Sequence, residues 1–78
     1  MMTCKIVSPQ QMQQYDAVNL IALPAYRGRM DVLTGHAEAF VLLVEGTITV
    51  AHGAGQTEQI PIEGGHCHVK DDDVVIIV

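Results

Sequence analysis

The sequence predicts an all-β domain, a small β-sandwich or flattened barrel of about eight to ten short, mostly antiparallel strands. Apolar and β-branched residues alternate with polar residues over many short segments, which is the period of a strand with one buried face. Residues that favour turns separate these segments about every 8–10 residues, a spacing typical of sandwiches and barrels. No stretch keeps a helical period long enough to indicate an amphipathic helix.

About nine strands are expected along the chain. They are Cys4–Val7, Gln10–Tyr15, Ala17–Leu23, Arg27–Leu33, Phe40–Val44, Thr47–Ala51, Glu58–Ile62, His66–Lys70 and Val74–Val78. Pro9 and Pro24 are expected to end the first and third strands, because proline has no N–H for the ladder. The second strand is polar, which predicts an exposed edge, and Gly35 breaks the fourth.

The fifth strand, Phe40–Val44, is apolar on both faces, as expected of a strand covered on two sides. We therefore expect Phe40, Leu42 and Leu43 to supply core. The strand after it follows a Glu-Gly turn and alternates cleanly between apolar and polar residues.

The last three strands have distinct expected positions in the fold. Pro61 removes a backbone donor from Glu58–Ile62, so this strand is expected at an edge or a bulge. Two glycines then turn the chain into His66–Lys70, and three aspartates form a charged turn. Val74–Val78 is entirely apolar, and such a strand promotes aggregation unless it is paired inside a sheet or covered.

Length and charge exclude several classes of protein. Seventy-eight residues without a linker indicate one domain, residues 1–78, near the lower size limit for folding on a hydrophobic core alone. The net charge is −5, with four Lys and Arg residues, which argues against nucleic acid and anionic membrane surfaces as partners. Three aromatic residues and no tryptophan offer little surface for base stacking.

The sequence also gives expectations about compartment and redox state. It has no apolar run long enough for a transmembrane helix, and its first residues lack the apolar region of a secretory signal. We therefore expect a cytoplasmic protein that does not insert into the membrane. Cys4 and Cys67 form no Cys-x-x-Cys pair, and two reduced, partly buried thiols are favoured over a disulfide between terminal strands.

Several motifs occur in an order and spacing typical of one family. The most distinctive segment contains Gly28-x-Met30, then Val32-Leu33, and then Gly35-His36-Ala37. The other motifs are Ile6-Val7-Ser8-Pro9, Val18–Pro24, Glu45-Gly46-Thr47-Ile48, and Gly64-Gly65 followed by Val69 and Val74. With these motifs, essentially the whole chain resembles the N-terminal β-sandwich of the epsilon subunit of F-type ATP synthases.

The resemblance implies a non-catalytic subunit without a cofactor, which couples the gamma subunit to the membrane c-ring in ATP synthesis and proton transport. It implies a peripheral location on the cytoplasmic face of the plasma (inner) membrane. The partner-binding residues that it implies are Arg27, Gly28, Arg29, Met30, Gly35 and His36. Two arginines suit acidic or carbonyl-rich loops, because a guanidinium presents a fork of donors. Some of Phe40, Leu42 and Leu43, besides supplying core, are expected to extend the gamma-facing surface.

The chain departs from the family pattern in two ways. The family usually has glycine at the position of Asp31 and proline at the positions of Thr34 and Glu38. These differences affect the contact surface more than the fold, because aspartate adopts positive φ more readily than most residues. The family also continues into two C-terminal helices, which this sequence lacks, so we expect a short or truncated form without regulation by them.

Two alternatives remain from the sequence. The first is a small cupin-like metal-binding β-barrel protein, because His66 and His68 share one face of a strand and stand about 6.6 Å apart along it. His36, His52 or Glu38 could complete such a site, although cupins place their His-x-His before the Glu-Gly turn. The simpler interpretation of this pair is two solvent-facing histidines, and that of His36 is a turn residue.

The second alternative is a generic β interaction module. No arrangement of residues indicates an independent enzyme.

Overall fold

The computed structural model describes residues 1–78 and contains eight strands and no helix. The strands are β1 (Met2–Val7), β2 (Met12–Ala25), β3 (Gly28–Leu33), β4 (Ala39–Leu43), β5 (Gly46–His52), β6 (Gln56–Ile62), β7 (Gly65–Lys70) and β8 (Asp73–Ile77). The predicted all-β class is therefore confirmed. The structure contains no helix, and so none that is long and apolar enough to cross a membrane.

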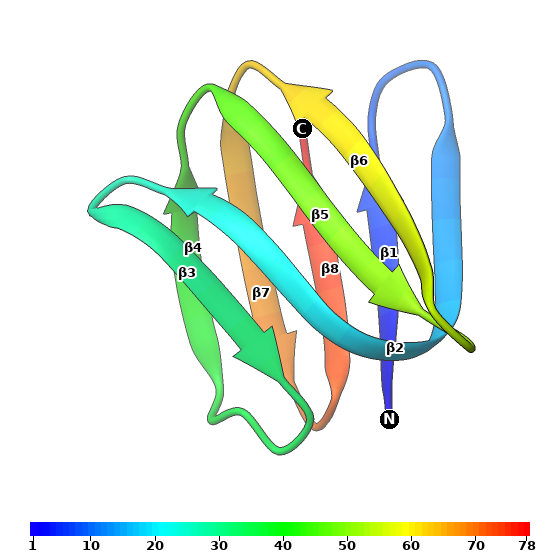
Figure 1. Cartoon of the computed structure of the whole chain (residues 1–78). Coiled ribbons are helices and arrows are strands. Elements are labelled where there is room, and N and C mark those ends of the chain that lie inside the picture. The colour runs from blue at the N-terminus through cyan, green and yellow to red at the C-terminus, as the bar shows by residue number, and fades with distance from the viewer.

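The strands form two layers that pack face to face (Figure 1). One layer contains β4, β7, β8 and β1, and we call it the rear sheet. The other contains β3, the second half of β2, β5 and β6, and we call it the front sheet. All neighbouring strands are antiparallel except β1 and β8, which run parallel. The predicted sandwich of mostly antiparallel strands is confirmed.

Strand β2 belongs to both layers. Its first half pairs with β1, and its second half pairs with β3 and β5. The change of layer occurs near Ala17, which has a φ of 53°, and the register with β5 shifts between Val18 and Leu20. A residue in the left-handed region bends a strand sharply without ending it. Two strands, Gln10–Tyr15 and Ala17–Leu23, were expected here, and this division is wrong.

Pro24 does not end β2, contrary to expectation. It stays in the ladder opposite Arg29, and its carbonyl oxygen accepts a hydrogen bond from the Val44 N–H at 2.9 Å. Proline lacks a donor but keeps its acceptor, so a strand continues through it where only the acceptor is needed. At Pro61 the expectation is confirmed, because β6 lies at the outer edge of the front sheet.

A single hydrophobic core fills the space between the layers. Its fifteen buried residues are Met2, Cys4, Ile6, Val18, Ile21, Leu23, Val32, Leu43, Ile48, Val50, Ile62, Cys67, Val69, Val74 and Ile76. The closing strand β8 lies between β1 and β7, so it is paired on both edges as expected. Burial of side chains from both sheets is what holds the two layers together.

Both cysteines lie in this core as free thiols. Burial raises the pKa of Cys4 to about 12, with a smaller contribution from Cys67, and raises the pKa of Cys67 to about 11. A low-dielectric environment disfavours the thiolate, so neither sulfur is a reactive nucleophile at neutral pH. Both thiols were expected to be partly buried, and the structure buries them fully.

The prediction that β4 is covered on two sides is wrong. Leu43 is buried, but Phe40 is 79% exposed and Leu42 is 60% exposed. In a two-layer sandwich each sheet has one covered face, and the outer face of the rear sheet has no third layer above it. Phe40 and Leu42 point to that outer face, so they do not supply core.

The Gly64-Gly65 turn lies in crowded surroundings. Gly65 has a φ of 148°, and a Cβ at this position would overlap the carbonyl oxygen of Ile77. The close approach of β7 to the end of β8 therefore requires glycine. Gly35, by contrast, has a φ of 86° with no atom within 4 Å of a Cβ placed on it.

Candidate functional site

The β2–β3 hairpin presents four of the six predicted partner-binding residues. Arg27 lies in the exposed turn, and Gly28, Arg29 and Met30 begin β3. Gly28 has a φ of 118°, a conformation that closes the turn and that side-chain-bearing residues rarely adopt. The hairpin is therefore an exposed loop at one end of an edge strand.

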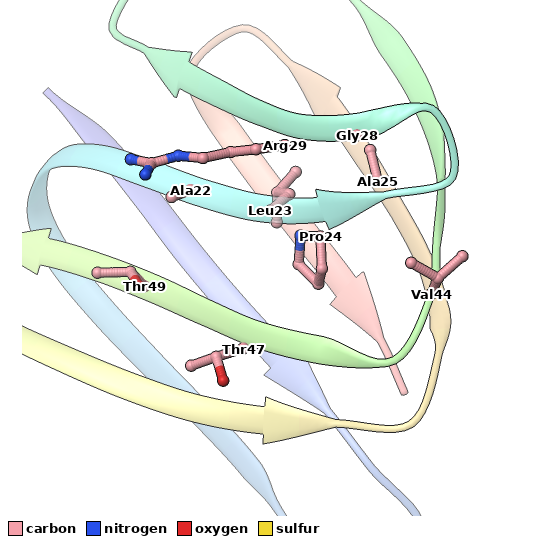
Figure 2. Close-up of a pocket in the computed structure, with 9 residues that line it drawn as sticks. All are labelled: Ala22, Leu23, Pro24, Ala25, Gly28, Arg29, Val44, Thr47 and Thr49. Atoms are coloured by element: carbon pink, nitrogen blue, oxygen red, sulfur yellow. The ribbon is translucent and has the colours of Figure 1, made fainter.

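The two arginines of the hairpin differ in their surroundings. The Nε of Arg29 donates a hydrogen bond to Oδ1 of Asp31 at 2.9 Å, and both side chains are largely exposed. Figure 2 shows Arg29 extending along β2 toward Ala22. Arg27 has no carboxylate within 4.0 Å. Arg27 is therefore the cation of the hairpin that is free to pair with an external group.

Met30 and Arg27 line a shallow apolar hollow together with residues of β4. The hollow is formed by Ala25, Tyr26, Arg27, Met30, Ala39, Phe40, Val41 and Leu42. Met30 also packs against the core, so it supports the hairpin as well as lining the hollow. The structure thus joins the arginine hairpin to the exposed apolar residues of β4 in one continuous region, which we call the β3–β4 edge.

Gly35 and His36 lie just beyond the opposite end of β3, which ends at Leu33, about 17 Å along the strand from Gly28. The Gly35 N–H donates to Oδ1 of Asp72 at 2.7 Å, which fixes the loop to the β7–β8 turn. His36 donates from its backbone N–H to the Leu33 carbonyl oxygen and from Nδ1–H to that of Ala37. These bonds match the simpler interpretation of His36 as a turn residue.

Phe40, His68 and Glu38 form a cluster of side chains that the sequence did not predict. Phe40 on β4 stacks on His68 on β7, with ring centroids 4.2 Å apart and an angle of 4° between the planes. His68 Nε2–H donates to Oε2 of Glu38 at 2.9 Å. The i, i+2 spacing of the histidines drew attention to His68, but no local pattern indicated these partners.

A second hollow lies on the outer face of the front sheet (Figure 2). Its lining residues are Ala22, Leu23, Pro24, Ala25, Gly28, Arg29, Val44, Thr47 and Thr49. Its polar groups are the Arg29 guanidinium and two threonine hydroxyls, all on the surface. No buried side-chain nitrogen or oxygen lacks a hydrogen-bond partner anywhere in the chain, so nothing here indicates a built ligand site.

The histidine-based metal site is not assembled. Among the candidate ligands, only Glu38 lies within hydrogen-bond distance of His68, and His52 instead pairs with Glu58 at 3.1 Å. No group of three His, Cys, Asp or Glu side chains is close enough to hold one ion. Cys67 and Val69 point into the core, as the simpler interpretation of this strand expected.

Comparisons with known proteins agree on one family. The family model described as the ATP synthase delta/epsilon chain β-sandwich domain matches residues 1–78. The chain is 30% identical over 73 residues to the ATP synthase epsilon chain of Granulibacter bethesdensis, covering 94% of this chain and 54% of that protein. It is 31% identical over 77 residues to the epsilon chain of Prochloron didemni, covering 99% and 56% respectively. The chain thus spans about half the length of the curated relatives it matches.

Solved structures show the same fold. A chain in the mitochondrial ATP synthase of Euglena gracilis, in a structure of OSCP, F1 and c-ring, has a TM-score of 0.85 and 26% identity, covering 96% of this chain and 48% of that one. A chain in the central stalk and c-ring structure from Tetrahymena thermophila has a TM-score of 0.82 at 14% identity, covering 99% and 62%. The second likeness concerns the fold alone.

Proposed function

The chain belongs to the delta/epsilon β-sandwich family of ATP synthases, and we propose that it is an epsilon-type subunit of the central stalk of a rotary F-type enzyme. In this role it is non-catalytic and couples the gamma subunit to the membrane c-ring during ATP synthesis and proton transport. The observation that carries the proposal is the family match over residues 1–78. Its location would be peripheral, on the cytoplasmic face of the plasma (inner) membrane.

The β2–β3 hairpin is the proposed contact with the c-ring. Arg27 supplies an unpaired guanidinium, which suits acidic or carbonyl-rich loops, and Gly28, Arg29 and Met30 shape the rest of the hairpin. Gly35 and His36, at the other end of β3, form the second proposed contact segment. Since the chain carries a net charge of −5, the hairpin is a local exception with two of the four Lys and Arg residues.

The outer face of β4 is the proposed contact with the gamma subunit. Phe40 and Leu42 are exposed there side by side, and they continue into the apolar hollow of the β3–β4 edge. Exposed aromatic and aliphatic side chains that gather on one face mark interaction surfaces, and a buried aromatic anchor often dominates the binding energy.

Binding to the cognate gamma subunit tests this proposal. We expect the wild-type chain to bind gamma at micromolar concentration in biolayer interferometry and to show no ATP hydrolysis alone. Phe40→Ala should raise the Kd by about 10-fold or more, because it removes the anchor. Met12→Ala is the matched control, since Met12 is a similarly exposed residue on the first half of β2. Absence of a complex with the wild-type chain would reject the function.

The two arginines offer a separate test of the c-ring contact. In a reconstituted enzyme, Arg27→Ala should reduce ATP-driven proton pumping more than Arg29→Ala, because the charge of Arg29 is already balanced by Asp31. The expected difference is about 3-fold, the size of one exposed charge-assisted contact. Equal effects of the two substitutions would show that the free guanidinium of Arg27 has no special role.

A further inference from the structure

We propose that His68 and Glu38 are positioning residues that hold the Phe40 ring as a pre-oriented anchor for the gamma subunit. The inference rests on the proposed function, because it concerns the same docking face. It adds two polar residues to that face and assigns them a role through Phe40.

The first step is the contact between Phe40 and His68. The two residues face each other across the β4–β7 ladder, so their side chains emerge on the same outer face of the rear sheet. Their rings lie parallel at a centroid distance of 4.2 Å. Phe40 is nevertheless 79% exposed, so one face of its ring is packed while the rest of the side chain is open to a partner.

The second step is the hydrogen bond from His68 to Glu38. The bond of 2.9 Å fixes the orientation of the imidazole, which otherwise rotates freely about its last torsion. Glu38 lies just before β4, only two residues from Phe40. The three side chains therefore form a clamp between the loop that enters β4 and the neighbouring strand β7.

The third step is the effect of such a clamp on binding. Exposed stacked rings and exposed carboxylate–imidazole pairs add little to folding stability. A side chain already held in its bound rotamer loses less freedom when a partner covers it, so the complex is tighter. Loss of the clamp should therefore weaken gamma binding by about 3- to 10-fold while leaving the fold intact.

The matched pair His68→Ala and His66→Ala tests this inference. His66 lies on the same strand and the same outer face, opposite Leu42, but makes no ring stacking and no side-chain hydrogen bond. The chain contains a single phenylalanine, so its Hα and Hβ signals can be assigned by NMR without ambiguity. We expect His68→Ala, and not His66→Ala, to average the Hα–Hβ couplings of Phe40, which report its χ1 rotamer, and to weaken gamma binding. The couplings are used because loss of the stacked imidazole changes the ring-proton shifts of Phe40 even when its rotamer stays the same.

Glu38 provides an independent variant. Glu38→Gln keeps an oxygen acceptor for His68 and should retain most of the affinity, whereas Glu38→Ala should behave like His68→Ala. Thermal unfolding of each variant separates a loss of positioning from a loss of fold. If His68→Ala itself unfolds the chain, the two Glu38 variants decide the question in the same two measurements.

The outcomes distinguish this inference from the proposed function. If Phe40→Ala weakens gamma binding but His68→Ala and His66→Ala behave alike, the clamp is overturned and the docking face stands. If His68→Ala weakens binding without changing the Hα–Hβ couplings of Phe40, His68 contacts gamma itself and does not act through Phe40, which also overturns the inference. If Phe40→Ala leaves gamma binding unchanged, the docking face and the clamp are both overturned, whereas the wild-type complex still supports the subunit assignment.

Discussion

Two glycine turns of this chain illustrate different uses of the same residue. Gly65 stands where β7 approaches the end of β8, and a side chain there would overlap the Ile77 carbonyl oxygen. Gly35 stands in the loop after β3, with open space around the position of a Cβ. The first glycine is required by close packing of backbones, and the second only by its positive φ. The crowded turn belongs to the folded core, and the open one belongs to Gly35 and His36, the second segment that we propose contacts a partner.

Gly65→Ala, compared with Gly35→Ala, should give the largest difference in unfolding free energy between the two turns. We expect it to lower the free energy of unfolding by about 4 kcal/mol or more, because a methyl group meets backbone that cannot move without breaking the β7–β8 pairing. Gly35→Ala should lower it by about 1 kcal/mol, the cost of a left-handed residue with a side chain. Urea unfolding of both variants measures the difference. Similar losses in the two variants would contradict the distinction.

High pH should lower the free energy of unfolding, because the two buried thiols ionise more readily in the unfolded chain. The folded pKa values of Cys4 and Cys67, about 12 and 11, lie above the ordinary value of 9.0, so the unfolded chain loses these protons first. The stability that the neutral thiols provide is complete below pH 9 and is lost as pH rises through 11 and 12. At pH 10 we expect a loss of about 1.4 kcal/mol per thiol.

The double variant Cys4→Ala, Cys67→Ala is the control for this prediction. It removes both titrating groups, so the decline in unfolding free energy between pH 8 and pH 10 should become shallower by about 3 kcal/mol. An unchanged pH dependence would show that burial does not raise the pKa values of the two thiols in the folded chain. Slow reaction of the wild-type thiols with Ellman's reagent before unfolding is expected for the same reason.

A small effect, similar to that of Gly35→Ala, is expected from loss of the hydrogen bond that ties the loop after β3 to the β7–β8 turn. The Gly35 N–H donates to the Asp72 carboxylate, and Asp72 itself has a φ of 63°. Asp72→Gly keeps that backbone conformation free of strain but removes the acceptor, and should lower the unfolding free energy by about 1 kcal/mol. Asp72→Asn keeps an acceptor and should lose less. Amide hydrogen exchange at Gly35 should accelerate in Asp72→Gly, and no acceleration would show that the bond does not hold the loop.

Much of the fold could be predicted from alternation and turn residues. Most of the eight strands lie within a few residues of an expected one, since most expected segments have an apolar face and are followed within two residues by glycine, proline or aspartate. Strand β2 instead joins two expected segments. The bend in β2 could not be predicted, because Ala17 carries no signal for a left-handed conformation. Pro24 misled the prediction because its acceptor, rather than its missing donor, is what the ladder uses there.

The candidate site was only partly accessible from the sequence. The arginine hairpin was identified by its glycine and its resemblance to the family, both of which are local signals. The exposure of Phe40 and Leu42 was missed, because a strand that is apolar on both faces looks the same whether a second layer or a partner covers it. The bond between Glu38 and His68 spans 30 positions, a separation at which no pattern within a strand carries information.

The parallel pairing of β1 and β8 has a consequence for the timing of folding. Thr3 to Val7 lie beside Asp73 to Ile77, so the first strand of the domain meets the last one at the centre of the rear sheet. On a ribosome, one edge of β1 must stay open until the end of β8 has left the exit tunnel, and such long-range pairing forms slowly. The rear sheet is therefore completed only after the whole domain has been synthesised. Until then, the backbone N–H and C=O groups of β1 and β7 that pair with β8 stay open to other nascent chains and to chaperones.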